Sequence, residues 1–144
     1  MIVLDASAAV DLLHGTPNSA FVREWFPERE QSFVAPDILM LEVAAATSRA
    51  VNRGLCSADR GQATIDVLLG LPMQLYPTSS ALRSAWAMRD NVTVADALYL
   101  EIAGALDATL VTTDEHLARA ARDRHVAVAS PGTARPTGPL ASIA

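Results

Sequence analysis

The sequence predicts an α/β fold with a mainly parallel sheet, in one domain of a 144-residue chain. Short apolar runs alternate with longer segments of helical periodicity, which is the pattern of βαβ units. Two of the apolar runs lead directly into an aspartate, at Asp5 and Asp114. Because parallel sheets place their ligand sites beyond the carboxyl ends of the strands, these two positions indicate where a functional site would lie.

Five strands and seven helices are expected. The strands are the apolar or β-branched runs Ile2–Leu4, Ser32–Ala35, Met73–Tyr76, Thr109–Thr112 and Val126–Ala129. The segments between them predict helices at Ser7–His14, Asn18–Glu28, Asp37–Arg53, Ala58–Leu69, Ser79–Arg89, Val94–Leu106 and Glu115–Asp123. Asp37 stands at the amino end of the third helix and Gly54 just beyond its carboxyl end, where capping residues are favoured.

The chain is expected to divide into a domain over residues 1–129 and a tail over residues 130–144. The tail is rich in Pro, Gly, Ser, Thr and Ala, which bury little apolar surface. No apolar stretch reaches the roughly eighteen residues of a membrane span, and no basic leader precedes the first strand. We therefore expect a cytoplasmic protein.

Composition limits the classes of function. Hydrophobic residues make up 51% of the chain and the mean hydropathy is +0.23, so we expect a partner or a second copy to cover some apolar surface. The net charge of −5 argues against a broad basic face for nucleic acid. Any contact with nucleic acid must therefore work through a local site.

Two acids follow strands. Asp5 comes directly after Ile2–Leu4, and Asp114 comes after the run Thr109–Thr113. Either carboxylate can be an ordinary N-cap of the helix that follows it, and for Asp114 alone that interpretation is favoured. The alternative for both residues is that the carboxylate projects into a site at the edge of the sheet.

Two further acids lie inside apolar helices. Glu42 belongs to a segment that is apolar on nearly every side, so we expect that helix to be buried on nearly every side. Asp96 has Tyr99, Leu100 and Ala103 as its helical neighbours, so it points along an apolar stripe. A carboxylate in such surroundings is costly unless a cation meets it.

Together the four acids predict a metal site. If Asp5, Glu42, Asp96 and Asp114 converge, their mutual repulsion requires cations. All-oxygen ligands without Cys or His favour Mg²⁺ or Mn²⁺ over zinc. Two such ions about 3.5 to 4 Å apart would suit in-line hydrolysis of a phosphodiester.

Four segments of the chain, in this order, resemble the PIN domains and in particular the VapC toxins. They are Ile2 to Ala8, Pro36 to Val43, Val94 to Tyr99 and Leu110 to Asp114, and the resemblance extends from Met1 to about Ala129. It implies a three-layer α/β/α sandwich with a mainly parallel central sheet. It also implies an acidic pocket in which Asp5, Glu42, Asp96 and Asp114 hold one or two divalent ions, Mg²⁺ or Mn²⁺.

The resemblance has further implications for residues and partners. Ser7 and Thr112 would be hydroxyl neighbours that orient a carboxylate or a water, although a capping or turn role is the alternative for both. VapC-like proteins cleave RNA, often a tRNA or a ribosomal RNA loop, are held inactive by a VapB-like antitoxin, and usually form homodimers. Arg49, two helical turns beyond Glu42, is a candidate phosphate contact, with a solvated or salt-bridged side chain as the alternative.

Three other functions are weighed against a toxin ribonuclease. A phosphotransferase of the haloacid dehalogenase type needs a second Asp two residues after the first, where this chain has Ser7, and the chain has no lysine to stabilise the phosphoryl group. A PIN-like binding module without catalysis would have lost an acid, and all four remain. A housekeeping PIN nuclease in RNA processing keeps the same chemistry, so the motifs do not separate it from a toxin.

Overall fold

The computed structural model describes residues 1–26 and 33–133. Its strands are β1 (Ile2–Leu4), β2 (Phe33–Pro36), β3 (Met73–Tyr76), β4 (Thr109–Val111) and β5 (Val128–Ala129). Its helices are α1 (Ala6–His14), α2 (Ser19–Arg23), α3 (Ile38–Asn52), α4 (Ala58–Gly70), α5 (Thr78–Ala87), α6 (Val94–Ala105) and α7 (Glu115–Asp123). Each element predicted from the sequence is present; β1, β3 and α7 have the predicted bounds, and the other elements have shifted ends.

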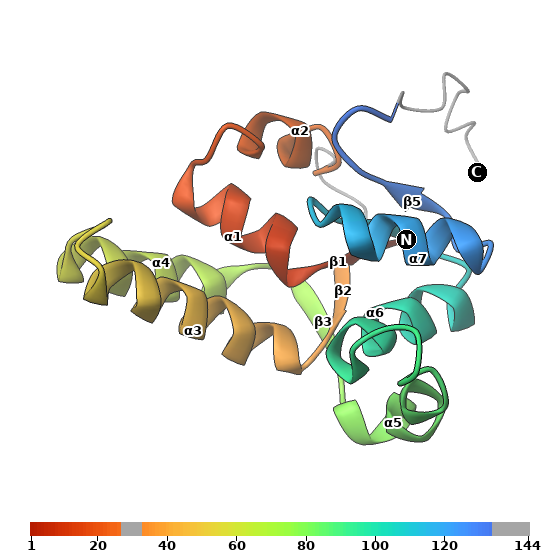
Figure 1. Ribbon diagram of the computed structural model, residues 1–144. Coiled ribbons are helices and arrows are strands. Elements are labelled where there is room, and N and C mark those ends of the chain that lie inside the picture. The colour runs from red at the N-terminus through yellow and green to blue at the C-terminus, as the bar shows by residue number, and fades with distance from the viewer. Residues whose placement is uncertain (27–32, 134–144) are drawn as a thin grey trace.

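The strands form one parallel sheet in the order β3-β2-β1-β4-β5. The chain thus moves outward from β1 to β3 and then crosses back to β4 and β5. Because such crossovers are right-handed, helices reached in opposite directions cover opposite faces of the sheet. Figure 1 shows this arrangement, with α1 to α4 on one side of the strands and α5 to α7 on the other. The predicted three-layer α/β/α sandwich is confirmed.

The strand order has one consequence for the site. β1 pairs with β2 on one side and with β4 on the other, so the direction of the crossovers reverses between β1 and β4. Open α/β sheets bind ligands in the crevice at such a reversal, beyond the carboxyl ends of the strands. Asp5 follows β1 and Asp114 lies three residues beyond β4, so both acids lie at this crevice.

The core explains why β1 is central. Ile2, Val3 and Leu4 are all buried, and α6 packs against β1, β2 and β4 with six buried residues of its own. A strand buried on both faces is a continuous apolar run with no polar alternation, as this one is. In the part of the chain that the structure describes, no helix is both long and apolar enough to cross a membrane.

Two of the predicted elements, β5 and α2, need correction. β5 begins at Val128 because Val126 still bonds to Ala121 at the end of α7, at 2.9 Å. α2 is shorter than the predicted Asn18–Glu28, the last two residues of which lie outside the described residues. The predicted tail begins at Ser130, which is buried and accepts a hydrogen bond from Arg122, while residues 134–144 lie outside the described part. The division into domain and tail stays a prediction.

Helix α3 also differs from expectation. The helix is not buried on nearly every side, because only Leu39, Val43 and Thr47 are fully buried and Leu41 is 73% exposed. Asp37 precedes the helix but makes no capping bond to it; its Oδ1 accepts instead from the Thr78 amide at 3.0 Å. Gly54, which follows the helix, has the left-handed φ of +72° that glycine tolerates.

Candidate active site

Asp5 lies at the centre of the site. It is the N-cap of α1, and its Oδ2 accepts hydrogen bonds from the Ser7 amide at 3.3 Å and from Thr112 Oγ1 at 2.7 Å. Ser7 Oγ donates to the same oxygen. The residue is only 4% exposed, and a buried carboxylate is costly without such donors. Asp5 therefore caps α1 and also lies at the centre of the candidate site, so the two interpretations of this residue do not exclude each other.

The hydroxyls of Ser7 and Thr112 connect helix α1 to the loop after β4. Their oxygens lie 3.2 Å apart, and each accepts a backbone amide from the loop after β4. The Thr113 amide donates to Ser7 Oγ at 3.2 Å, and the Asp114 amide donates to Thr112 Oγ1 at 3.0 Å. This network orients Asp5 and also fixes the backbone that carries Asp114.

Asp114 and Asp96 both stand at helix amino ends. Asp114 is the N-cap of α7, and its Oδ1 accepts from the amides of His116 at 2.8 Å and Leu117 at 3.3 Å. Both bonds end on Oδ1, so the cap uses one of the two carboxylate oxygens. Asp96 lies in the first turn of α6, where Thr93 Oγ1 accepts the Asp96 amide at 3.1 Å. Helix amino ends favour negative charge, which fits acids at these positions.

Glu42 is held by a residue for which sequence reasoning gave no role. Tyr99 on α6 is fully buried, and its hydroxyl donates to Glu42 Oε2 at 3.0 Å. Burial, helped by the nearby charges of Asp5 and Glu42, raises the pKa of the Tyr99 phenol, so it stays a donor. The sequence did contain a signal for this role of Tyr99. The hydroxyl of a buried tyrosine needs a hydrogen-bond partner, and Tyr99 lies one helical turn beyond the candidate acid Asp96.

Electrostatic coupling joins the four acids. Burial raises the pKa of Asp5. The hydrogen bonds from the Ser7 and Thr112 hydroxyls lower this pKa, and the negative charge of Asp96 raises it. Burial likewise raises the pKa of Glu42, with additions from Asp5 and Asp96. Burial and then the charge of Asp114 raise the pKa of Asp96, while His116 acts in the opposite direction. Each acid is thus within electrostatic range of at least one other.

The donor set suits a hard divalent cation, although the acids do not form a tight cluster. Within residues 1–26 and 33–133, no group of three or more acids, histidines or cysteines lies close enough to enclose a metal ion. The ion pairs of those same residues do not include any of the four acids. Partly or fully buried carboxylates that repel one another and form no ion pair are what Mg²⁺ or Mn²⁺ would neutralise.

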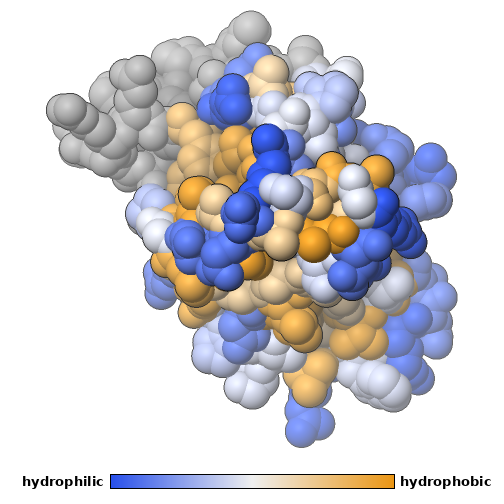
Figure 2. Space-filling view, turned by 90° about the vertical axis from the view of Figure 1, so that its left-hand side faces the viewer, coloured by the Kyte–Doolittle hydropathy of each residue, from blue (hydrophilic) through white to orange (hydrophobic). Residues whose placement is uncertain are grey.

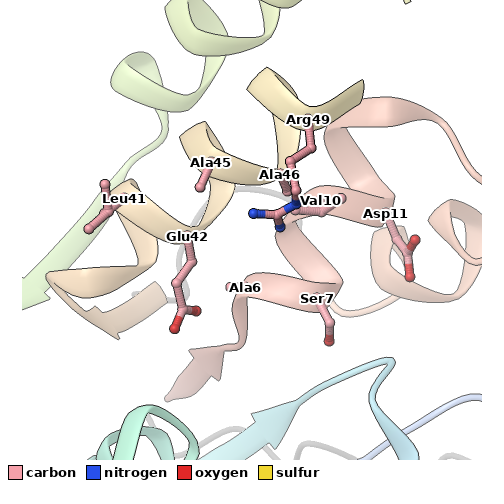
Figure 3. Close-up of a pocket in the computed structure, with 9 residues that line it drawn as sticks. All are labelled: Ala6, Ser7, Val10, Asp11, Leu41, Glu42, Ala45, Ala46 and Arg49. Carbon is pink, nitrogen blue, oxygen red and sulfur yellow. The ribbon is translucent and has the colours of Figure 1, made fainter. Parts of the chain in front are cut away.

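A hollow of about 600 Å³ opens beside the acids, between α1 and α3. Figure 3 shows Ser7 and Glu42 at one end of it and Arg49 farther along α3. Its floor is built from small residues, chiefly Ala6, Ala45 and Ala46. Sequence reasoning did not predict this groove, because it arises from the packing of two helices that are distant in sequence.

Comparison with known proteins decides the family. Residues 2–123 match the family model of the PIN domain. The chain belongs to the PIN-domain family. Among curated proteins of Mycobacterium tuberculosis, it is 41% identical to ribonuclease VapC1, over 82% of this chain and 89% of that protein. It is 38% identical to ribonuclease VapC12, over 83% of this chain and 91% of that protein.

Two solved structures have the same fold. VapC20 of Mycobacterium tuberculosis, described as a sarcin-ricin loop cleaving toxin, superposes with a TM-score of 0.64 at 13% identity, covering 83% of this chain and 95% of that one. VapBC2 of Rickettsia felis, solved with a DNA fragment from its promoter, gives 0.61 at 18% identity, covering 90% and 98%. The predicted membership of the PIN-domain ribonucleases of the VapC type is confirmed.

The raised pKa of Asp96 predicts how pH affects the metal-free protein. A carboxyl whose pKa is higher in the folded state adds stability below its unfolded pKa of about 4, and this stability is lost as pH rises through the folded pKa. Asp96→Asn removes this titration. In EDTA, the free energy of unfolding of Asp96→Asn should therefore rise relative to wild type as the pH increases above about 4, as measured by urea denaturation.

Asp59→Asn is the matched control, because Asp59 is an exposed acid in the first turn of α4. Both substitutions remove a favourable interaction between a carboxylate and a helix amino end, but only Asp96 lies close to other acids of the candidate site. An equal pH-dependent change in the two variants would contradict the coupling of the four acids.

Proposed function

We propose that this PIN-domain protein is an endoribonuclease that depends on Mg²⁺ or Mn²⁺, with Asp5, Glu42, Asp96 and Asp114 as the residues that hold the ion. The single observation that supports the proposal most is the electrostatic coupling of these four partly or fully buried acids at the reversal point of the sheet. When bound, a divalent ion supplies Lewis-acid activation of a phosphodiester and of water.

The residues of the chain have distinct roles in this proposal. Ser7 and Thr112 orient Asp5 by donating to its Oδ2, and these hydrogen bonds lower the pKa of the Asp5 carboxyl against the effect of burial, which raises it. Tyr99 holds the Glu42 side chain by its hydrogen bond. The cap that Asp114 makes to α7 occupies Oδ1 and leaves Oδ2 for the ion.

The toxin role and the antitoxin are proposed from the relatives and from the surface. We propose that the chain is the toxin of a toxin–antitoxin pair, acts in the cytoplasm on a tRNA or ribosomal RNA, and is bound by a VapB-like antitoxin. The neighbour VapC20 is described as a toxin that cleaves the sarcin-ricin loop. In Figure 2, apolar patches interrupt the hydrophilic surface, and exposed apolar residues of α3, α4 and the turn after α3 include Leu41, Leu55, Val67 and Leu69. Such patches mark surfaces that bind other proteins.

A homodimer is proposed through a different surface. Leu82 and Trp86 on α5 are exposed, and with Val94 they line a second hollow of about 620 Å³. Light scattering should give twice the chain mass of 15.2 kDa for wild type and the mass of one chain for Leu82→Arg. A monomeric wild type would contradict the proposed dimer. A dimeric Leu82→Arg variant would show that the dimer interface does not include Leu82.

Cleavage of total RNA tests the proposed activity. The wild type should produce discrete fragments in Mg²⁺ or Mn²⁺ and none in EDTA. Asp96→Asn should lose at least about 100-fold in rate, because changes in the groups around metal ligands already cost roughly 10- to 100-fold. Primer extension measures the rate at each cut.

Asp59→Asn should cleave like wild type, since Asp59 is exposed on α4 away from the site. Circular dichroism of each variant establishes that it is folded. Cleavage by Asp96→Asn at the wild-type rate, or cleavage that persists in EDTA, would refute the proposed chemistry.

A further inference from the structure

The groove between α1 and α3 begins at the acids and runs outward along both helices. Both helices have their amino ends near the edge of the sheet, so Ser7 and Glu42 mark its inner end. Farther along the two helices and outside the groove, His14 Nε2 and Thr47 Oγ1 form a hydrogen bond of 2.9 Å that links α1 to α3. The alanines of the groove leave a hollow of about 600 Å³, enough for a nucleotide-sized group.

Arg49 is the one basic residue among those lining this groove. It is exposed, and within the described part of the chain its guanidinium makes no ion pair or hydrogen bond. Figure 3 shows its guanidinium extending from α3 into the space between the helices. Asp11 also lines the groove but forms no ion pair with Arg49; its carboxylate accepts instead from Thr16 Oγ1 at 2.8 Å and Asn18 Nδ2 at 3.2 Å.

The distance between Arg49 and the acids follows from the geometry of helix α3. Glu42 and Arg49 are seven residues apart on one helix, which corresponds to about 10 Å along the axis. A single RNA strand whose scissile phosphate lies at the acids would reach Arg49 with a neighbouring phosphate. The net charge of −5 makes such a local cation important, because the protein has no general attraction for RNA.

We infer that Arg49 is a substrate-positioning residue that binds a phosphate of the RNA next to the one that is cleaved. The inference rests on the proposed function and deepens it by assigning the α1–α3 groove to the substrate strand. The planar guanidinium can donate two parallel hydrogen bonds to one phosphate, which fixes the strand as well as attracting it.

The test uses the full chain and an RNA oligonucleotide that spans a cut mapped in total RNA. Arg49→Ala should raise KM about tenfold and leave kcat within about twofold, because the lost contact binds substrate and transition state alike. The slope of log(kcat/KM) against log[salt] should become shallower by about 0.7, the value for one phosphate on a single strand. Arg49→Lys should keep the salt slope and show an intermediate KM.

Arg53→Ala is the matched control, since Arg53 is exposed one turn farther along the chain and does not line the groove. It should match wild type in both KM and salt slope. Equal kinetics of Arg49→Ala and wild type would overturn the inference and leave the ribonuclease standing. If Arg49→Ala loses only its affinity for a partner protein, the groove belongs to that protein and the inference is wrong. A wild type that cleaves no RNA would instead refute the proposed function itself.

Discussion

The Asp5 carboxylate is buried at the end of the central strand, and the arrangement of the site depends on how it is satisfied. Its Oδ2 receives bonds from α1, through Ser7, and from the end of β4, through Thr112. The same hydroxyls accept the amides of Thr113 and Asp114. Satisfying one buried charge therefore also sets the position of a second acid, since a buried polar group without partners would destabilise the fold.

Three helix amino ends meet at this point. Asp5 caps α1, Asp114 caps α7, and Asp96 lies in the first turn of α6. Each helix dipole favours the negative charge at its own end, which offsets part of the cost of burial. The offset is incomplete, because the pKa values of Asp5, Glu42 and Asp96 all remain raised. The remaining excess of negative charge is the physical reason to expect a divalent cation.

Sequence reasoning could predict what depends on local pattern. Apolar runs gave the strands, and an acid directly after a strand identified Asp5 and Asp114 as candidates. The parallel sheet followed from the alternation of strands and helices. The acids inside apolar helices, Glu42 and Asp96, were found because a carboxylate is out of place there.

What could not be predicted depends on tertiary packing. The strand order that brings β1 and β4 side by side is not written in any one segment. The contact of Tyr99 with Glu42 joins α6 to α3, and the exposure of Leu41 depends on which stripe of α3 faces the core. The groove that gives Arg49 its significance exists only where α1 and α3 pack.

Binding of Mn²⁺ in the absence of RNA tests most directly the claim that the four acids act together as a metal site. Electron paramagnetic resonance of free Mn²⁺ should show saturable binding to wild type and to Asp59→Asn, and a loss of at least about tenfold in affinity for Asp5→Asn. Wild-type affinity in folded Asp5→Asn, or no saturable binding by the wild type, would contradict the account.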